Sequence, residues 1–120
     1  MDEQNPTRKF KKELMAGLSS LVLLAVLDRA GREMYGYEIT KALKAEAESG
    51  PLFKQGAIYP VLRSLEALRL LSSRIEPQGF GPPRRYYAIT ADGRRALADW
   101  ISTWRDMRDF VEGALNGEAL

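Results

Sequence analysis

The chain has 120 residues, of which 45% are hydrophobic and 28% are charged, so it suits one globular domain with a single core. It contains no cysteine and no histidine, which excludes disulfides, thiolate metal sites and catalysis by a histidine base. We therefore expect no metal, no cofactor and no enzymatic activity, and the net charge of +2 is less informative than where the charges lie.

Basic residues are concentrated in the middle of the chain. Residues 54–95 include eight basic and three acidic side chains, whereas residues 96–120 include two basic and five acidic ones. A polyanionic partner would meet the middle segment, although ordinary solvated charge would give the same imbalance. The longest apolar run, 21–27, is too short to cross a membrane, and we expect a cytoplasmic protein with no membrane partner.

The N-terminal part is predicted as a flexible arm followed by a helix. Residues 1–11 are rich in basic side chains but lead into no signal-peptide pattern, and we expect a basic arm there. From 12 to 30 the spacing predicts a helix that is buried on most sides and that ends at Gly31. Its leucines recur at steps of three or four residues: Leu14, Leu18, Leu21, Leu24 and Leu27.

Two short helices follow, over about 36–48 and 56–68. The first ends at Gly50 and Pro51, because proline restricts the residue before it and donates no backbone hydrogen bond. The second tolerates Pro60 only near its first turn. Its apolar stripe follows helical spacing, and its opposite face is polar, with Gln55, Tyr59, Arg63 and Glu66.

The next segment predicts a hairpin. Strands are expected over 71–75 and 84–89, the second of which is rich in residues with high strand propensity. The residues between them form a glycine and proline cluster that cannot continue either strand, so 76–83 reads as a long loop.

The last helix is predicted from Thr90, a plausible N-cap, to Leu115, with residues 116–120 as a tail. Its apolar stripe is longer than a small domain can cover, which implies a partner, most simply a second copy of the chain. The predicted dimer interface comprises Leu97, Ile101, Trp104, Phe110 and Val111.

Together these elements predict an α+β, mostly α, fold: a winged helix-turn-helix over 12–90 with a long dimerisation helix over 91–115. In such a fold the second short helix enters the major groove of double-stranded DNA, and the basic hairpin lies along phosphates. The candidate recognition residues are Lys54, Gln55, Tyr59 and Arg63, and the wing candidates are Arg84 and Arg85, with Arg74 as a further candidate.

Several of these residues have a second interpretation. Arg63 could merely solvate its helix, although DNA contact is favoured, with phosphate ahead of a base edge. Tyr59 could donate to phosphate or pack on the preceding helix, and Tyr35 and Tyr37 are expected to pack. Since side chains alternate along a strand, only one of Arg84 and Arg85 is expected to face DNA at a time.

Three motifs resemble the PadR family of transcriptional regulators: MYGYEI at 34–39, GAIYPVLRSLE at 56–66, and PPRRYYAIT at 82–90 followed by Gly93. The resemblance covers about 14–115 and points to the compact subgroup with a single C-terminal helix. It implies a homodimeric regulator, usually a repressor, that binds an inverted-repeat operator and dimerises through its first and last helices. One departure is Arg69, where the family usually has the glycine that stops the recognition helix in a left-handed conformation.

The resemblance also suggests an effector site. In drug-responsive members a tryptophan of the last helix stacks planar aromatic compounds at the dimer interface, and Trp104 matches it, with Trp100 beside it and Leu14 and Leu21 facing it. We favour the simpler interpretation that both tryptophans fill the dimer core. Two other functions compete with DNA binding: a winged-helix protein-interaction module, and an enzyme, which the residue content disfavours.

Overall fold

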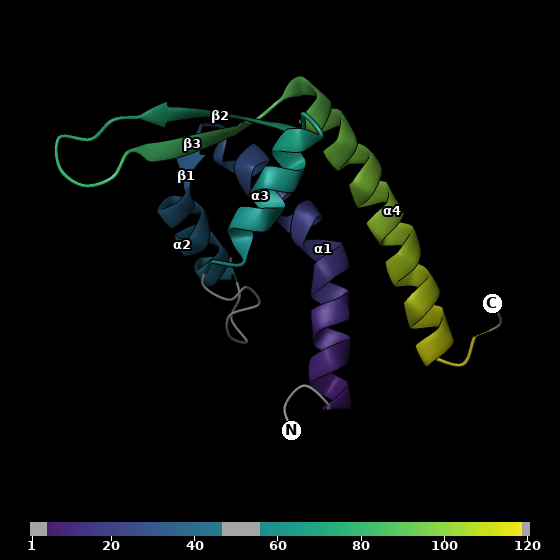
Figure 1. The fold of residues 1–120 in the computed structure, drawn as a ribbon. Helices are drawn as coiled ribbons and strands as arrows, with labels where there is room; N and C mark the ends of the chain where they lie inside the picture. The colour runs from purple at the N-terminus through teal and green to yellow at the C-terminus, as the bar shows by residue number, and fades with distance from the viewer. Residues whose placement is uncertain (1–4, 47–55, 119–120) are drawn as a thin grey trace.

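A computed structural model describes residues 5–46 and 56–118, and these residues form four helices and a small sheet (Figure 1). In chain order they are α1 (Pro6–Ala30), β1 (Met34–Tyr35), α2 (Gly36–Glu46), α3 (Ile58–Ala67), β2 (Leu71–Glu76), β3 (Arg84–Ile89) and α4 (Ala91–Leu115). The architecture is the winged helix-turn-helix predicted from the sequence, mostly α with one antiparallel sheet. No helix in the described part of the chain is long and apolar enough to span a membrane.

The first helix starts earlier than the sequence analysis predicted. The Asn5 side chain accepts hydrogen bonds from the backbone N–H groups of Thr7 and Arg8, and Pro6 occupies the first turn, where its missing N–H costs nothing. Lys9 and Glu13 add an ion pair one turn apart. The prediction of a flexible arm over 1–11 is therefore wrong from residue 6 onward, and residues 1–4 lie outside the described part.

The core lies where α1, α2 and α3 meet the sheet. Leu23, Leu24 and Leu27 of α1 are fully buried, as are Leu62 and Leu65 of α3. The helical spacing that predicted these two helices thus corresponds to their buried faces. Ile39, Ile58 and Leu71 complete the fully buried set.

The sheet has three strands in the order β1, β3, β2, all antiparallel. The hairpin of β2 and β3 was predicted, and it is one residue longer than expected on β2. The two-residue strand β1 was not predicted, because a strand this short shows no alternation. It pairs Tyr35 with Tyr86 and so joins the start of α2 to the middle strand of the wing.

A tight corner connects α3, the wing and α4. Arg69 adopts a left-handed conformation (φ 63°), the one expected of the glycine that the resemblance predicts at this position. The turn therefore forms with arginine in place of glycine, at a conformational cost of about 1 kcal/mol. The Thr90 backbone N–H donates to the Leu70 carbonyl at 3.1 Å, and the Thr90 hydroxyl donates to the Arg69 carbonyl at 2.8 Å. The same hydroxyl accepts from the Gly93 N–H at 2.9 Å, which caps α4 as predicted.

The helix α4 packs on the core through side chains of its N-terminal half. Leu97, which the sequence analysis assigned to a dimer interface, is a core residue of its own chain and only 5% exposed, because it faces the buried side of α1 and the sheet. Trp100 and Ile101 pack partly against the same core. Farther along, α1 and α4 diverge toward the chain ends (Figure 1), and apolar side chains are left exposed there: Phe10, Leu14, Trp104, Met107, Phe110, Val111 and Leu115.

Candidate nucleic-acid interface

A groove lies between α3 and the wing, and it brings together most of the described DNA-binding candidates. Tyr59 and Arg63 line it from α3, and Arg84 and Arg85 line it from β3. Residues at the start of α2 and in the loop of the wing also line it. Lys54 and Gln55, the other two candidates, lie outside the described residues.

The position of Tyr59 depends on a glycine in the neighbouring helix. A Cβ atom added to Gly36 would lie 2.6 Å from the Tyr59 hydroxyl oxygen, so the ring covers Gly36 at the first turn of α2. Tyr59 therefore packs on the second helix, one of the two alternatives raised by the sequence. It is nevertheless 42% exposed, and its exposed part lines the groove.

Arg63 is exposed on the same face of α3, one turn after Tyr59. Among the described residues no hydrogen bond or ion pair involves its guanidinium group. Tyr87 lies beneath the groove, where burial raises the pKa of its hydroxyl despite the opposing charges of Arg85 and Arg63. The Glu66 carboxylate also lines the groove, but Arg63, Arg84 and Arg85 leave it with an excess of positive charge, which suits an anionic ligand.

The two wing arginines point to opposite faces of the sheet, as the alternation predicted. Arg85 faces α3, and its guanidinium donates to the Ser73 hydroxyl at 2.9 Å. That hydroxyl donates to the Glu66 carboxylate at 2.5 Å, which connects the wing to the recognition helix. Arg84 instead lies over the Tyr35 ring, 4.4 Å from its centroid.

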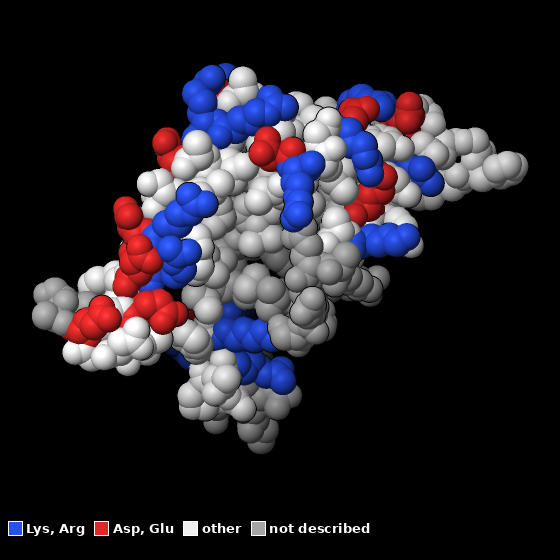
Figure 2. Space-filling view, turned by 180° about the vertical axis from the view of Figure 1, so that it is seen from behind, with Lys and Arg blue, Asp and Glu red and all other residues white. Residues whose placement is uncertain are grey.

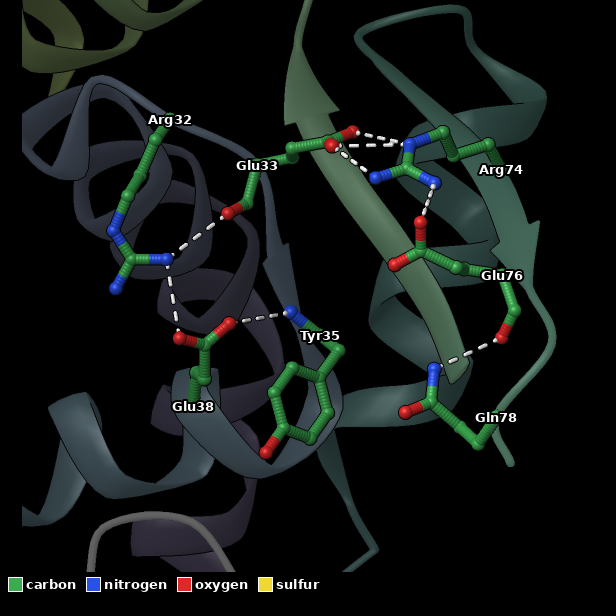
Figure 3. Close-up of polar contacts among 7 residues, drawn as sticks. All are labelled: Arg32, Glu33, Tyr35, Glu38, Arg74, Glu76 and Gln78. Carbon is green, nitrogen blue, oxygen red and sulfur yellow. Dashed lines mark hydrogen bonds and ion pairs between the residues drawn. The ribbon is translucent and has the colours of Figure 1, made fainter. Parts of the chain in front are cut away.

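Arg74, the third wing candidate, is held in a cluster of polar contacts on the face of the sheet opposite Ser73 (Figure 3), and it is not among the residues that line the groove. Its guanidinium donates to both carboxylate oxygens of Glu33 at 2.5–3.0 Å and lies 3.3 Å from a carboxylate oxygen of Glu76. It also covers the Tyr86 ring at 4.9 Å. Its partners raise the pKa of Arg74 further, and the guanidinium lowers the pKa of Glu33. Arg74 therefore ties β2 across β3 to the residue before β1.

A second set of polar contacts, next to those of Arg74 with Glu33, fixes the start of α2 (Figure 3). Arg32 donates to the Glu38 carboxylate and to the Glu33 carbonyl, both at 3.1 Å, and Glu38 accepts from the Tyr35 N–H at 3.2 Å. The sequence analysis missed Glu33, because nothing local in the sequence pairs it with a residue 41 positions away. On the face seen in Figure 2, charges of both signs are interspersed.

The four effector candidates divide into two pairs. Leu21 and Trp100 pack against the core of their own chain, whereas Leu14 and Trp104 are exposed, the latter to 38%. Within the described residues no group of acidic side chains could hold a metal ion.

Comparison with known proteins agrees with this architecture. The family model of the "Transcriptional regulator PadR-like family" matches residues 23–99. A PadR family transcriptional regulator from Eggerthella lenta is 30% identical, with a TM-score of 0.71 and 91% of each chain covered. A PadR-like transcriptional regulator from Bacillus cereus is 26% identical, with a TM-score of 0.69 and 88% of this chain and 99% of that chain covered.

A protein of Lysinibacillus sphaericus, described only as uncharacterized, is 24% identical over 100 residues, which are 83% of this chain and 89% of that protein. The family match covers the helix-turn-helix, the wing and the start of α4, which are the elements that build the groove. The chain therefore belongs to the PadR-like family of transcriptional regulators.

Proposed function

We propose that this protein is a homodimeric repressor that binds an inverted-repeat operator through α3 and the wing. The observation that carries the proposal is the groove in which Tyr59 and Arg63, whose guanidinium group no described residue pairs, face Arg85 on the wing. An α-helix fits the major groove, and arginines beside it can bind base edges and phosphates. Lys54 and Gln55, just before α3 in the sequence, are proposed to extend this contact.

The exposed apolar side chains of α1 and α4 support dimerisation. Trp104, Phe110 and Val111 form a stripe on α4 that the chain itself leaves uncovered, and Leu14 is exposed on α1, the helix that packs beside α4. Burying such a stripe against a second copy removes it from water. A two-fold dimer would then offer its recognition helices to half-sites about 34 Å apart.

We further propose that a planar aromatic compound releases the repressor by binding at this interface. Trp104 and Leu14 are exposed and could line such a site, whereas Trp100 and Leu21 are partly buried against the core and would support it from behind. An exposed indole ring stacks well on flat aromatic compounds. Without a ligand, Trp104 would simply fill the dimer core, while Trp100 packs against the core of its own chain.

DNA binding is tested by fluorescence anisotropy with a duplex from the promoter region of the protein's own gene, measured over a series of salt concentrations. We expect tight binding that weakens steeply with salt, and a loss of about tenfold or more for Arg63→Glu and for Arg85→Glu. Arg95→Glu is the matched control, since it makes the same charge change on the exposed start of α4 and should bind nearly as the wild type.

Three outcomes would contradict the proposal. Wild-type protein that fails to bind the duplex even at low salt is not an operator-binding regulator. Equal losses in the Arg63, Arg85 and Arg95 variants would show that binding follows net charge and not the groove. If folded, dimeric protein bound no duplex but retained a protein partner in all three variants, a protein-interaction module would replace the repressor.

A further inference from the structure

The tip of the wing carries one large apolar side chain with nothing covering it. Phe80 is 99% exposed, the highest exposure among the large hydrophobic residues of the described part of the chain. In Figure 1 the loop that holds it extends well away from the helices. Because the ring of Phe80 is fully hydrated, burying its large apolar surface against a partner would be favourable through the hydrophobic effect.

The loop around Phe80 is held in a defined shape. The Gln78 side-chain amide donates to the carbonyls of Glu76 and Pro77 at 3.2 and 3.4 Å. Gly81 has a φ of 81°, a conformation that residues with side chains rarely adopt, and Pro82 and Pro83 restrict the return to β3. A tip restrained in this way loses little conformational entropy when it binds.

The surroundings of Phe80 point to one kind of partner. It lines the same groove as Tyr59 and Arg63, so a ligand that fills the groove also meets the ring. Residues 77–83 include no charged side chain, and Arg84 and Arg85 follow them directly. In Figure 2 the end of the wing is accordingly white beyond the last charged groups. An apolar tip on a cationic hairpin suits a polyanion whose grooves have apolar walls, which describes duplex DNA.

We propose that Phe80 enters the minor groove beside the site read by α3 and acts there as an apolar wedge. The inference rests on the proposed function and adds a residue that selects sequence without a hydrogen bond. A ring placed against the sugars and between base steps partly unstacks them, which costs least at flexible pyrimidine–purine steps. The wing therefore reads how easily the flanking DNA deforms, while α3 reads base edges.

The test compares Phe80→Ala and Phe80→Leu with wild type by anisotropy on the operator duplex over a range of salt concentrations. Phe80→Ala is expected to bind about tenfold or more weakly with an unchanged salt slope, since no phosphate contact is lost. Phe80→Leu should retain part of the affinity. Leu68→Ala is the matched control, because it removes another exposed apolar side chain, at the end of α3 and outside the groove.

A second measurement locates the contact. Hydroxyl-radical footprinting should show minor-groove protection flanking each half-site with wild-type protein and no such protection with Phe80→Ala. Replacing the flanking pyrimidine–purine step by an A-tract should weaken wild-type binding and leave the Phe80→Ala affinity unchanged.

The outcomes separate this inference from the proposed function. If Phe80→Ala binds within twofold of wild type with the same footprint, while Arg63→Glu fails to bind, the wedge is refuted and the repressor stands. If Phe80→Ala changes only the sedimentation of the free protein, the ring contacts a second copy and the wedge is again refuted. If wild type binds no duplex, both proposals fail together.

Discussion

Replacing Gly93 by alanine tests the corner that joins the wing to α4. The added Cβ would lie 2.2 Å from the Leu70 carbonyl oxygen and 2.7 Å from Ile89 Cγ1, whereas real Cβ atoms essentially never come within 3.0 Å of such neighbours. The first of these is a backbone atom, so the clash cannot be relieved by rotating a side chain. The start of α4 must move away from Leu70, the residue before β2, which disturbs the 3.1 Å hydrogen bond from Thr90 to Leu70.

The expected loss follows from these contacts. Overpacking costs about 1–3 kcal/mol, and disturbing the Thr90 cap of α4 adds about 1 kcal/mol. Together they predict a lower free energy of unfolding by about 2–4 kcal/mol, which for a domain of this size lowers the melting temperature by roughly 10 °C or more. The loss includes no contribution from DNA contacts, since Gly93 lies outside the groove.

The assay is urea unfolding followed by the fluorescence of Trp100 and Trp104, at one fixed protein concentration because a dimer's stability depends on concentration. Gly79→Ala is the matched control: it makes the same change in the wing loop, where a Cβ meets nothing within 4 Å, and should leave stability unchanged or raise it by up to about 1 kcal/mol. Equal denaturation midpoints for Gly93→Ala and wild type would refute the packing argument.

Two further perturbations follow from the same structure. Because Arg74 lowers the pKa of Glu33, this carboxylate stabilises the fold at pH values above the ordinary glutamate pKa of 4.5, and the stabilisation is lost as the pH falls through the lowered pKa. Glu33→Gln should therefore flatten the dependence of the melting temperature on pH in that acidic range, and an unchanged slope there would contradict the role of the pair. Phe110→Asp puts a charge at a position 57% exposed in the single chain, so sedimentation should show folded monomers in place of dimers, and persistent dimers would exclude this part of α4 from the interface.

The periodicity of apolar residues predicted α1 and α3, because the core of a small domain imposes it directly, whereas strand propensity and the glycine and proline cluster predicted the hairpin. Ile58, Leu62 and Leu65 recur at helical spacing and are all buried against α1 and the sheet. The start of α1 was predicted wrongly because its signals leave no apolar pattern: the Asn5 side chain caps backbone N–H groups, and Pro6 occupies a first-turn position that needs no N–H donor. The sequence nevertheless carried this signal, as a capping residue followed by proline.

The contacts that position the site were less predictable than the elements. Helical spacing placed Leu97 and Phe110 on one stripe, but it could not separate the part covered by the chain's own core from the part left exposed. The two-residue period of a strand correctly predicted that Arg84 and Arg85 lie on opposite faces. Which of the two faces α3 depends on the register of β3 against β2. Long-range pairs such as Glu33 with Arg74 require the folded topology.

A single residue, Thr90, separates the last strand of the wing from the first residue of α4, and its backbone and hydroxyl are both engaged at the end of α3. No flexible linker therefore separates α4, which is proposed to pair two subunits, from the wing and α3, which are proposed to bind DNA. In such a dimer the distance between half-sites is fixed by the protein, because the DNA-binding elements cannot move relative to the dimerisation helix. One inserted base pair would rotate a half-site by about 35° around the duplex axis, and the protein has no linker with which to follow it.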